Sequence, residues 1–179
     1  MKRPGAQDLD ERIVAEITEL CERGDDDVEH QRYDEALARY KAALALVPAP
    51  VLAWKATAWI LTALGETLYF KRDFPAARDA LNDALRCTGA VGNPFLHLRL
   101  GQVELELGNR GRALDELLRA HTRAGEDIFA GEDPRYLEMV KEAIRRDEEG
   151  RRSQSLWSGF VGAAPQTPRP LRGRASSAR

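Results

Sequence analysis

Small and apolar residues recur with one fixed spacing in three segments of the chain. In each segment a glycine (Gly24, Gly65 or Gly101) precedes one alanine by 12 positions (Ala36, Ala77 or Ala113), and a second alanine follows 7 positions later (Ala43, Ala84 or Ala120). Ala, Leu, Glu and Arg, which lose little side-chain freedom in a helix, are frequent throughout. No segment alternates apolar and polar residues as a strand does. The pattern predicts an all-α protein with an internal repeat.

Each repeat predicts two antiparallel helices. The glycine, in the first helix, has no Cβ, so the second helix can approach closely at that point, and the two alanines assist from the other side. A larger residue between the alanines, Tyr40, Leu81 or Leu117, fills the space that remains. Polar or glycine-containing turns, Lys71-Arg72-Asp73 and Gly108-Asn109-Arg110, separate the helices.

These segments resemble tetratricopeptide repeats (TPRs), whose family pattern spans about 34 residues. The resemblance implies a solenoid of helical hairpins, with repeats at about 17–48, 58–90 and 94–125. The spacing between glycines stretches to 41 and then 36 residues. We place the extra length in a long helix over 51–72, opened by Pro48 and Pro50, and in the turn from Gly89 to Pro94.

A repeat stack leaves an apolar face open at its end and needs a cap. A helix over about 133–148 suits this role, because Asp133 is a favourable N-cap and Pro134 a favourable first residue. Its apolar face carries Tyr136, Leu137, Val140 and Ile144. We therefore expect a repeat domain over 1–150, followed by a disordered tail over 151–179 that is rich in Arg, Ser and Pro.

Charge is distributed unevenly along the chain. The segment 151–179 holds six arginines and no carboxylate, so removing this +6 from the net charge of −2 leaves −8 for residues 1–150. An acidic body disfavours nucleic-acid binding and favours a basic protein partner. No stretch has the roughly 20 apolar residues of a membrane span, and the first residues lack a signal-peptide core, so we expect a cytoplasmic location and no membrane partner.

The residues offer little catalytic chemistry. Residues 1–152 contain no serine, and His30, His97 and His121 lie on separate repeats without metal-ligand spacing. The run from Asp25 to Asp27 lacks the ligand pattern of a calcium loop and is interpreted as a solvated acidic face. We expect no enzyme activity, no cofactor, no metal and no small-molecule substrate.

Cys21 and Cys87, the two cysteines, are far apart and lack zinc-site spacing. They are expected to be small buried apolar residues rather than a disulfide or metal ligands.

The TPR resemblance implies that the first helix of each repeat lines a concave groove. Residues at the family's groove positions, proposed here as the partner-binding set, are Asp25, Glu29, Trp59, Thr62, Glu66, Tyr69, Phe70, Phe95, Arg99, Gln102 and Glu106. Aromatic anchors beside carboxylates suit an interface. Glu66 and Glu106 are expected at its solvated rim, while Trp59, Tyr69 and Phe95 could instead pack between repeats.

One family function is disfavoured by these residues. TPR co-chaperones that grip carboxyl-terminal peptides use Lys, Asn and Arg at five groove positions, to neutralise the terminal carboxylates. The corresponding residues here are Cys21, Asp25, Ala63, Phe95 and Arg99. Four of the five do not match, so a carboxylate clamp is not expected.

Several segments are similar to small bacterial TPR proteins that accompany secreted toxins as immunity partners. These segments are Trp59-Ile60, Ala63–Glu66, Gly92–Gly101 and Gly131–Tyr136. The resemblance implies binding and neutralisation of a cognate toxin, and an acidic scaffold would suit a basic toxin. A secretion chaperone, or a general scaffold that holds a partner segment in the groove, is the alternative. A chaperone would cradle an extended apolar segment, whereas an immunity protein would bind a folded domain.

Overall fold

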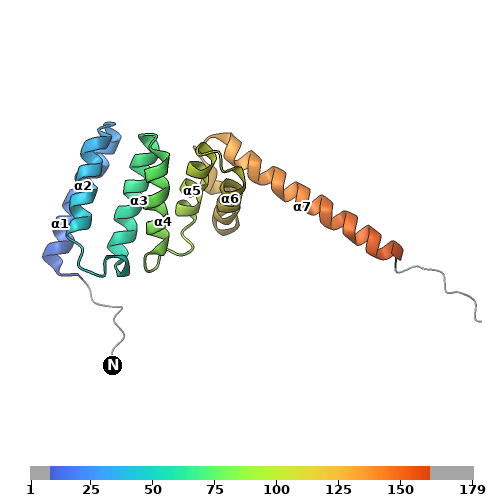
Figure 1. The fold of residues 1–179 in the computed structure, drawn as a ribbon, viewed down its shortest axis with the longest axis horizontal. Coiled ribbons are helices and arrows are strands. Elements are labelled where there is room, and N and C mark those ends of the chain that lie inside the picture. Colours follow the sequence, from blue (N-terminus) through green and yellow to red (C-terminus); the bar gives the residue numbers. More distant parts are fainter. Residues whose placement is uncertain (1–8, 162–179) are drawn as a thin grey trace, which may run out of the picture. The chain divides into compact units, whose positions relative to one another are not determined.

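The computed structural model describes residues 9–161, and in this range the protein consists of helices and their connections (Figure 1). The helices are α1 (Glu11–Glu29), α2 (Tyr33–Ala45), α3 (Lys55–Phe70), α4 (Phe74–Arg86), α5 (Pro94–Glu106), α6 (Arg110–Ala124) and α7 (Pro134–Val161). Two short 3-10 helices, η1 (Val51–Ala53) and η2 (Glu126–Phe129), lie between them. The all-α prediction is confirmed.

The chain divides into two compact units, Met1–Val140 and Lys141–Arg179. In the first unit α1 packs on α2, α3 on α4 and α5 on α6, and each hairpin packs on the next through α2 with α3 and α4 with α5. These are the three predicted hairpins, in sequence order (Figure 1). The described part of the second unit is the remainder of α7, from Lys141 to Val161.

The repeated glycines lie where the two helices of each hairpin touch. A Cβ added at Gly24 would stand 2.6 Å from Cε1 of Tyr40, at Gly65 2.6 Å from Cγ of Leu81, and at Gly101 2.7 Å from Cγ of Leu117. Real Cβ atoms essentially never come within 3.0 Å of an atom in a neighbouring helix. The predicted pairing of a glycine with a large residue is therefore confirmed in all three hairpins.

The alanines that flank these large residues are completely buried. Ala36, Ala43, Ala77, Ala84, Ala113 and Ala120 each have an exposed fraction of 0%. A larger side chain at any of them would push the helices apart, so the spacing that repeats in this sequence reflects the distance between paired helices.

The turn between the paired helices also repeats. Gln31, Arg72 and Gly108 lie 7 residues after the three glycines and have φ of 59°, 66° and 80°. Glycine adopts this left-handed conformation without strain, and a helix often ends with it. The turn geometry is therefore the same in all three repeats, although only the third has glycine at this position and the first two have a larger residue.

The start of the helix predicted over 51–72 is corrected. The helix expected over 51–72 is interrupted, because Trp54 is extended (φ −100°, ψ 137°) and separates η1 from α3. Its indole Nε1 donates to the carbonyl of Pro48 at 2.8 Å, and the Thr57 hydroxyl donates to the carbonyl of Val51 at 2.6 Å. These bonds fix a folded connection where the sequence suggested one long helix.

The capping helix begins as predicted. An oxygen of Asp133 accepts from the backbone N–H of Arg135 at 2.9 Å, and α7 starts at Pro134. Tyr136 and Val140 from its predicted apolar face are buried, with exposed fractions of 1% and 0%. The helix runs past the predicted end near 148 and includes 151–161, which the sequence assigned to the tail; the rest of that tail, 162–179, lies outside the described residues.

Within residues 9–161, none of the helices combines the length and the apolar character needed to cross a bilayer.

The glycine contacts predict a stability difference between two Gly→Ala variants. Gly65→Ala should lower the free energy of unfolding by about 1–3 kcal/mol, because the new methyl group would overlap Leu81. Gly111→Ala in α6 is the control, because a Cβ there meets no atom within 4 Å beyond its chain neighbours and its own helix backbone, and alanine favours a helix by up to about 1 kcal/mol. Urea unfolding measures both. Equal stability of the two variants would contradict the close-approach account.

Candidate functional site

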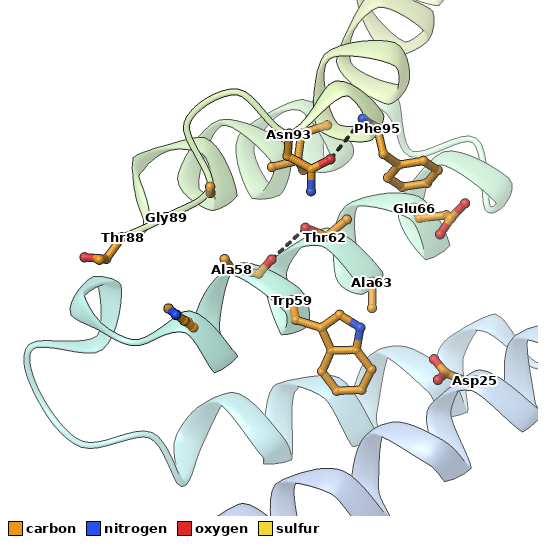
Figure 2. Close-up of a pocket in the computed structure, with 13 residues that line it drawn as sticks. Asp25, Ala58, Trp59, Thr62, Ala63, Glu66, Thr88, Gly89, Asn93 and Phe95 are labelled. Atoms are coloured by element: carbon orange, nitrogen blue, oxygen red, sulfur yellow. Dashed lines mark hydrogen bonds between the residues drawn. The ribbon is translucent and has the colours of Figure 1, made fainter. Parts of the chain in front are cut away.

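Two adjoining clefts open on the face formed by α1, α3 and α5. The larger has a volume of about 640 Å³ and follows α3 from Lys55 to Glu66, with the 88–93 connection and the start of α5 opposite (Figure 2). Its lining includes Asp25, Trp59, Thr62, Glu66 and Phe95, all from the predicted set. The Trp59 side chain is 47% exposed, so it is available to a partner rather than packed between repeats.

The smaller cleft, of about 280 Å³, continues along α3 toward Phe70. Its lining residues are Asp25, Val28, Glu29, Tyr40, Ala63, Glu66, Thr67 and Phe70. Asp25, Ala63 and Glu66 belong to both clefts, so the two form one continuous groove. Phe70 is 42% exposed and stacks on Tyr33 with ring centroids 6.3 Å apart.

The remaining four predicted residues line neither cleft. Tyr69, Arg99, Gln102 and Glu106 are all engaged with other parts of the protein. Gln102 is completely buried and Arg99 is 4% exposed, so a partner in the groove would have little or no access to either side chain.

Arg99 lies at the centre of an aromatic cluster. Its guanidinium carbon is 4.9 Å from the ring centroid of Tyr69, 5.5 Å from that of Phe70 and 5.1 Å from that of Phe95. One guanidinium nitrogen donates to Glu66 at 2.6 Å. The arginine thus holds together groove residues from α3 and α5, and burial makes its ion pair with Glu66 costly to break.

Glu132, which precedes the N-cap of α7, and residues at the start of α7 bind the side chains at groove positions of the third repeat. Glu132 accepts from the amide of Gln102 at 2.8 Å and lies 3.6 Å from Arg99. Arg135 pairs with Glu106 and also donates to the Tyr136 hydroxyl at 2.7 Å. The hydroxyls of Tyr69 and Tyr136 are 3.3 Å apart. The cap therefore occupies this end of the groove and also contacts Tyr69 at the end of α3. The first repeat, the rest of α3 and the start of α5 remain open.

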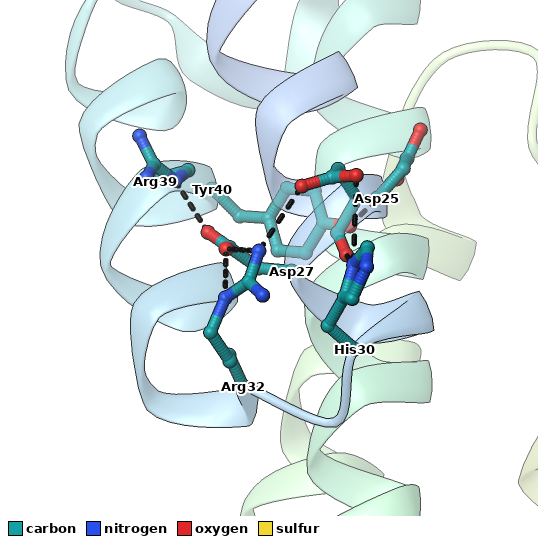
Figure 3. Close-up of polar contacts among 7 residues, drawn as sticks. Asp25, Asp27, His30, Arg32, Arg39 and Tyr40 are labelled. Carbon is teal, nitrogen blue, oxygen red and sulfur yellow. Dashed lines mark hydrogen bonds and ion pairs between the residues drawn. The ribbon is translucent and has the colours of Figure 1, made fainter.

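The aspartate run in α1 divides into different roles. Asp25 and Asp26 are exposed, whereas Asp27 is only 3% exposed, which corrects the expectation of a wholly solvated face. Figure 3 shows Asp27 between two arginines: Arg32 donates at 2.8 Å and Arg39 at 2.5 Å. Hydrogen bonding from Arg39, and then from Arg32, holds the pKa of Asp27 below its ordinary value. This carboxylate joins α1 to α2.

Asp25 faces the groove and supports it. Its Oδ1 accepts from the Tyr40 hydroxyl at 2.6 Å (Figure 3). Burial, followed by this hydrogen bond, raises the pKa of Tyr40, so the phenol stays protonated as a donor. Tyr40 is also the large residue opposite Gly24, so one side chain both fills the hairpin contact and orients a groove carboxylate.

Three carboxylates have surroundings that the sequence did not indicate. Glu66 and Glu106 were expected at a solvated rim but are bound to Arg99 and Arg135. Glu116, on the outer helix α6, lies 2.6 Å from the imidazole of the buried His97. Replacing any of these three would disturb the fold as well as the surface, so they are poor positions for testing partner binding.

Both cysteines are free and buried, with exposed fractions of 0% for Cys21 and 1% for Cys87. Burial, with a smaller effect of Asp25, raises the pKa of Cys21 to about 11, so its thiol is protonated near neutral pH. The expectation of small buried residues is confirmed.

Three helical hairpins stacked in order, with a continuous groove along one face, define a helical-repeat protein. Tetratricopeptide-repeat patterns match residues 18–88 and 62–127, which together cover more than half of the chain. The protein belongs to the tetratricopeptide-repeat family, whose members generally bind proteins and are typically non-catalytic.

Solved structures show the same fold. One is the C-terminal TPR-containing domain of a Plasmodium falciparum protein described as an FK506-binding protein: TM-score 0.58, 17% identity, 82% of this chain and 97% of that chain covered. Another is MamA, with a TM-score of 0.52, 16% identity and coverage of 76% of this chain and 81% of that one. None of the curated proteins matches the sequence. At these identities the likeness concerns the fold alone.

The Asp27 cluster predicts a dependence of stability on pH. A carboxyl whose pKa is lowered by folding stabilises the protein above its unfolded pKa, and this contribution is lost as the pH falls through the folded pKa. Asp27→Asn should therefore be less stable at pH 7 and should lose less stability than the natural protein between about pH 4 and pH 2. Urea unfolding at several pH values measures this slope. Asp115→Asn, at an exposed position of α6, should keep the natural slope, and parallel curves for Asp27→Asn would contradict the role of the cluster.

Proposed function

We propose that this TPR protein is a non-enzymatic module that holds a basic protein partner in the groove formed by α1, α3 and the start of α5. The observation that carries the proposal is the combination, in one groove, of the exposed Trp59 and Phe70 with the carboxylates Asp25 and Glu29. Partly exposed aromatic side chains in a cleft are the usual anchors of an interface. Carboxylates beside them favour a positively charged partner and speed its association.

The more specific proposal is an immunity role, in which the partner is a cognate bacterial toxin whose activity is blocked by binding. It is supported by the resemblance of segments such as Ala63–Glu66 and Gly131–Tyr136 to toxin-associated TPR proteins, and by the charge of −8 on residues 1–150. Many toxins that act on nucleic acids are basic, so an acidic protein could mask their binding surface.

A secretion chaperone for an extended apolar segment fits the groove less well. Such a segment needs a continuous apolar surface, whereas the open part of this groove places carboxylates on both sides of Ala63. The third repeat cannot extend the apolar surface, because its groove positions are occupied by Glu132 and Arg135.

The experiment that tests the immunity role uses the product of the gene next to this one. The full chain and that product are coexpressed, copurified and assayed for the toxic activity of the product. We expect a complex in which the activity is inhibited. A neighbouring product that is non-toxic, or whose toxicity is unaffected by the complex, would refute the immunity role and leave only a scaffold function.

Binding of this partner should depend on Trp59. We expect Trp59→Ala to weaken the complex by about 2 kcal/mol or more, as for a central aromatic anchor, while circular dichroism shows an unchanged helix content. Affinity should also fall as salt is added, since the attraction between the acidic groove and the basic partner is screened. Calorimetric titration measures both effects.

The control is Asp115→Asn, which removes a carboxylate from the outer helix α6 and should leave affinity unchanged. If this variant lost binding while Trp59→Ala retained it, the partner would bind the outer face and the groove proposal would be wrong.

A further inference from the structure

The smaller cleft has an excess of carboxylates over bases. Asp25 and Glu29 lie one turn apart on α1, and Glu66 faces them from α3. Arg99 is bound to Glu66, but within the described residues no basic side chain pairs with Asp25 or Glu29. The cleft therefore retains two uncompensated negative charges.

The hydroxyl groups of this cleft already donate hydrogen bonds to other groups of the protein. The Tyr40 hydroxyl donates to Asp25, and the Thr67 hydroxyl donates to the carbonyl of Ala63 at 2.8 Å. The cleft thus presents acceptors without free hydroxyl donors. A guest that brings several N–H donors and a positive charge matches this surface, and an anion does not.

The walls between the charges are apolar. Val28 is half-buried, Ala63 is half-buried, and Phe70 is exposed at the end of α3. Such walls suit the methylene stem of a lysine or arginine, whose charged end would reach the carboxylates. The volume of about 280 Å³ is large enough for one such side chain.

The larger cleft is different in character. Trp59, Phe95 and Leu96 are the large apolar residues in its lining. Lys55 lies at the end remote from Glu66, about 16 Å away along α3. A cation is thus favoured at the Glu66 end and an apolar group near Trp59. Trp59 and Glu66 are about 10 Å apart along the helix axis, the span of three residues in an extended chain.

We infer that the groove recognises an extended loop on the surface of the folded partner, with a lysine or arginine side chain in the smaller cleft and an apolar side chain, three residues away, against Trp59. This inference rests on the proposed function, because it specifies what the groove binds.

The probe is an acetylated and amidated peptide of glycine and serine that carries one arginine and, three residues later, one leucine. Titrated into the isotopically labelled full chain, it should give saturable NMR shifts at Asp25, Glu29, Thr67 and the Trp59 indole. Replacing its arginine by citrulline, which has the same shape without the charge, should weaken binding about tenfold or more, as should the double change Asp25→Asn with Glu29→Gln.

The double change is expected to leave the fold intact, because an asparagine at position 25 keeps a side-chain oxygen that can accept a hydrogen bond from Tyr40. Asp115→Asn should bind the peptide like the natural protein. Equal binding of the arginine and citrulline peptides, shifts confined to other residues, or no saturable binding would each overturn the inference. The groove proposal would survive such a result if the partner's affinity still depended on Trp59, and both would fail if it did not.

Discussion

The close approach of paired helices at three glycines is the constraint on which the rest of this structure depends. Each glycine contacts one large residue of the facing helix. The buried alanines on either side of that residue are small enough to let the two helices lie close together. The same contact recurs in every hairpin, so the inner helices present a regular face along which the groove forms. In the first repeat the contact residue is Tyr40, whose hydroxyl also fixes Asp25 in the groove.

Charged groups then decide which part of this face remains open. Arg99, enclosed by three aromatic rings, fixes Glu66 at the boundary between the two clefts. The residues 132–136 supply partners for Gln102 and Glu106 of the third repeat, so these groove positions are satisfied within the protein. Asp25 and Glu29 are left facing solvent in the groove. The charged residues of the third repeat are therefore paired within the protein, whereas those of the first repeat face an open part of the groove. We assign the partner to this open part.

The sequence predicted the features that depend on local spacing, and missed those that depend on contacts between distant residues. Gly65 and Leu81 could be paired because both recur at fixed positions in each repeat. The burial of Asp27 could not be predicted, since it requires Arg39 from the facing helix, and neighbouring aspartates with the same side chain are exposed. The same applies to Gln102, which the family pattern places in the groove but which Glu132 covers from 30 residues away. Repeat spacing carries no signal for such pairings, because they occur only once.

Photocrosslinking from the groove tests most directly whether it is the binding surface. A benzoylphenylalanine replaces Thr62, which lines the larger cleft, or Ala38, which is exposed on the outer helix α2. Each variant is irradiated in the cells that produce the protein, and crosslinked peptides are identified by mass spectrometry. The account predicts crosslinks from position 62 to one protein, at segments rich in lysine or arginine, and none to that protein from position 38. Crosslinks to the same partner from position 38 alone would contradict it.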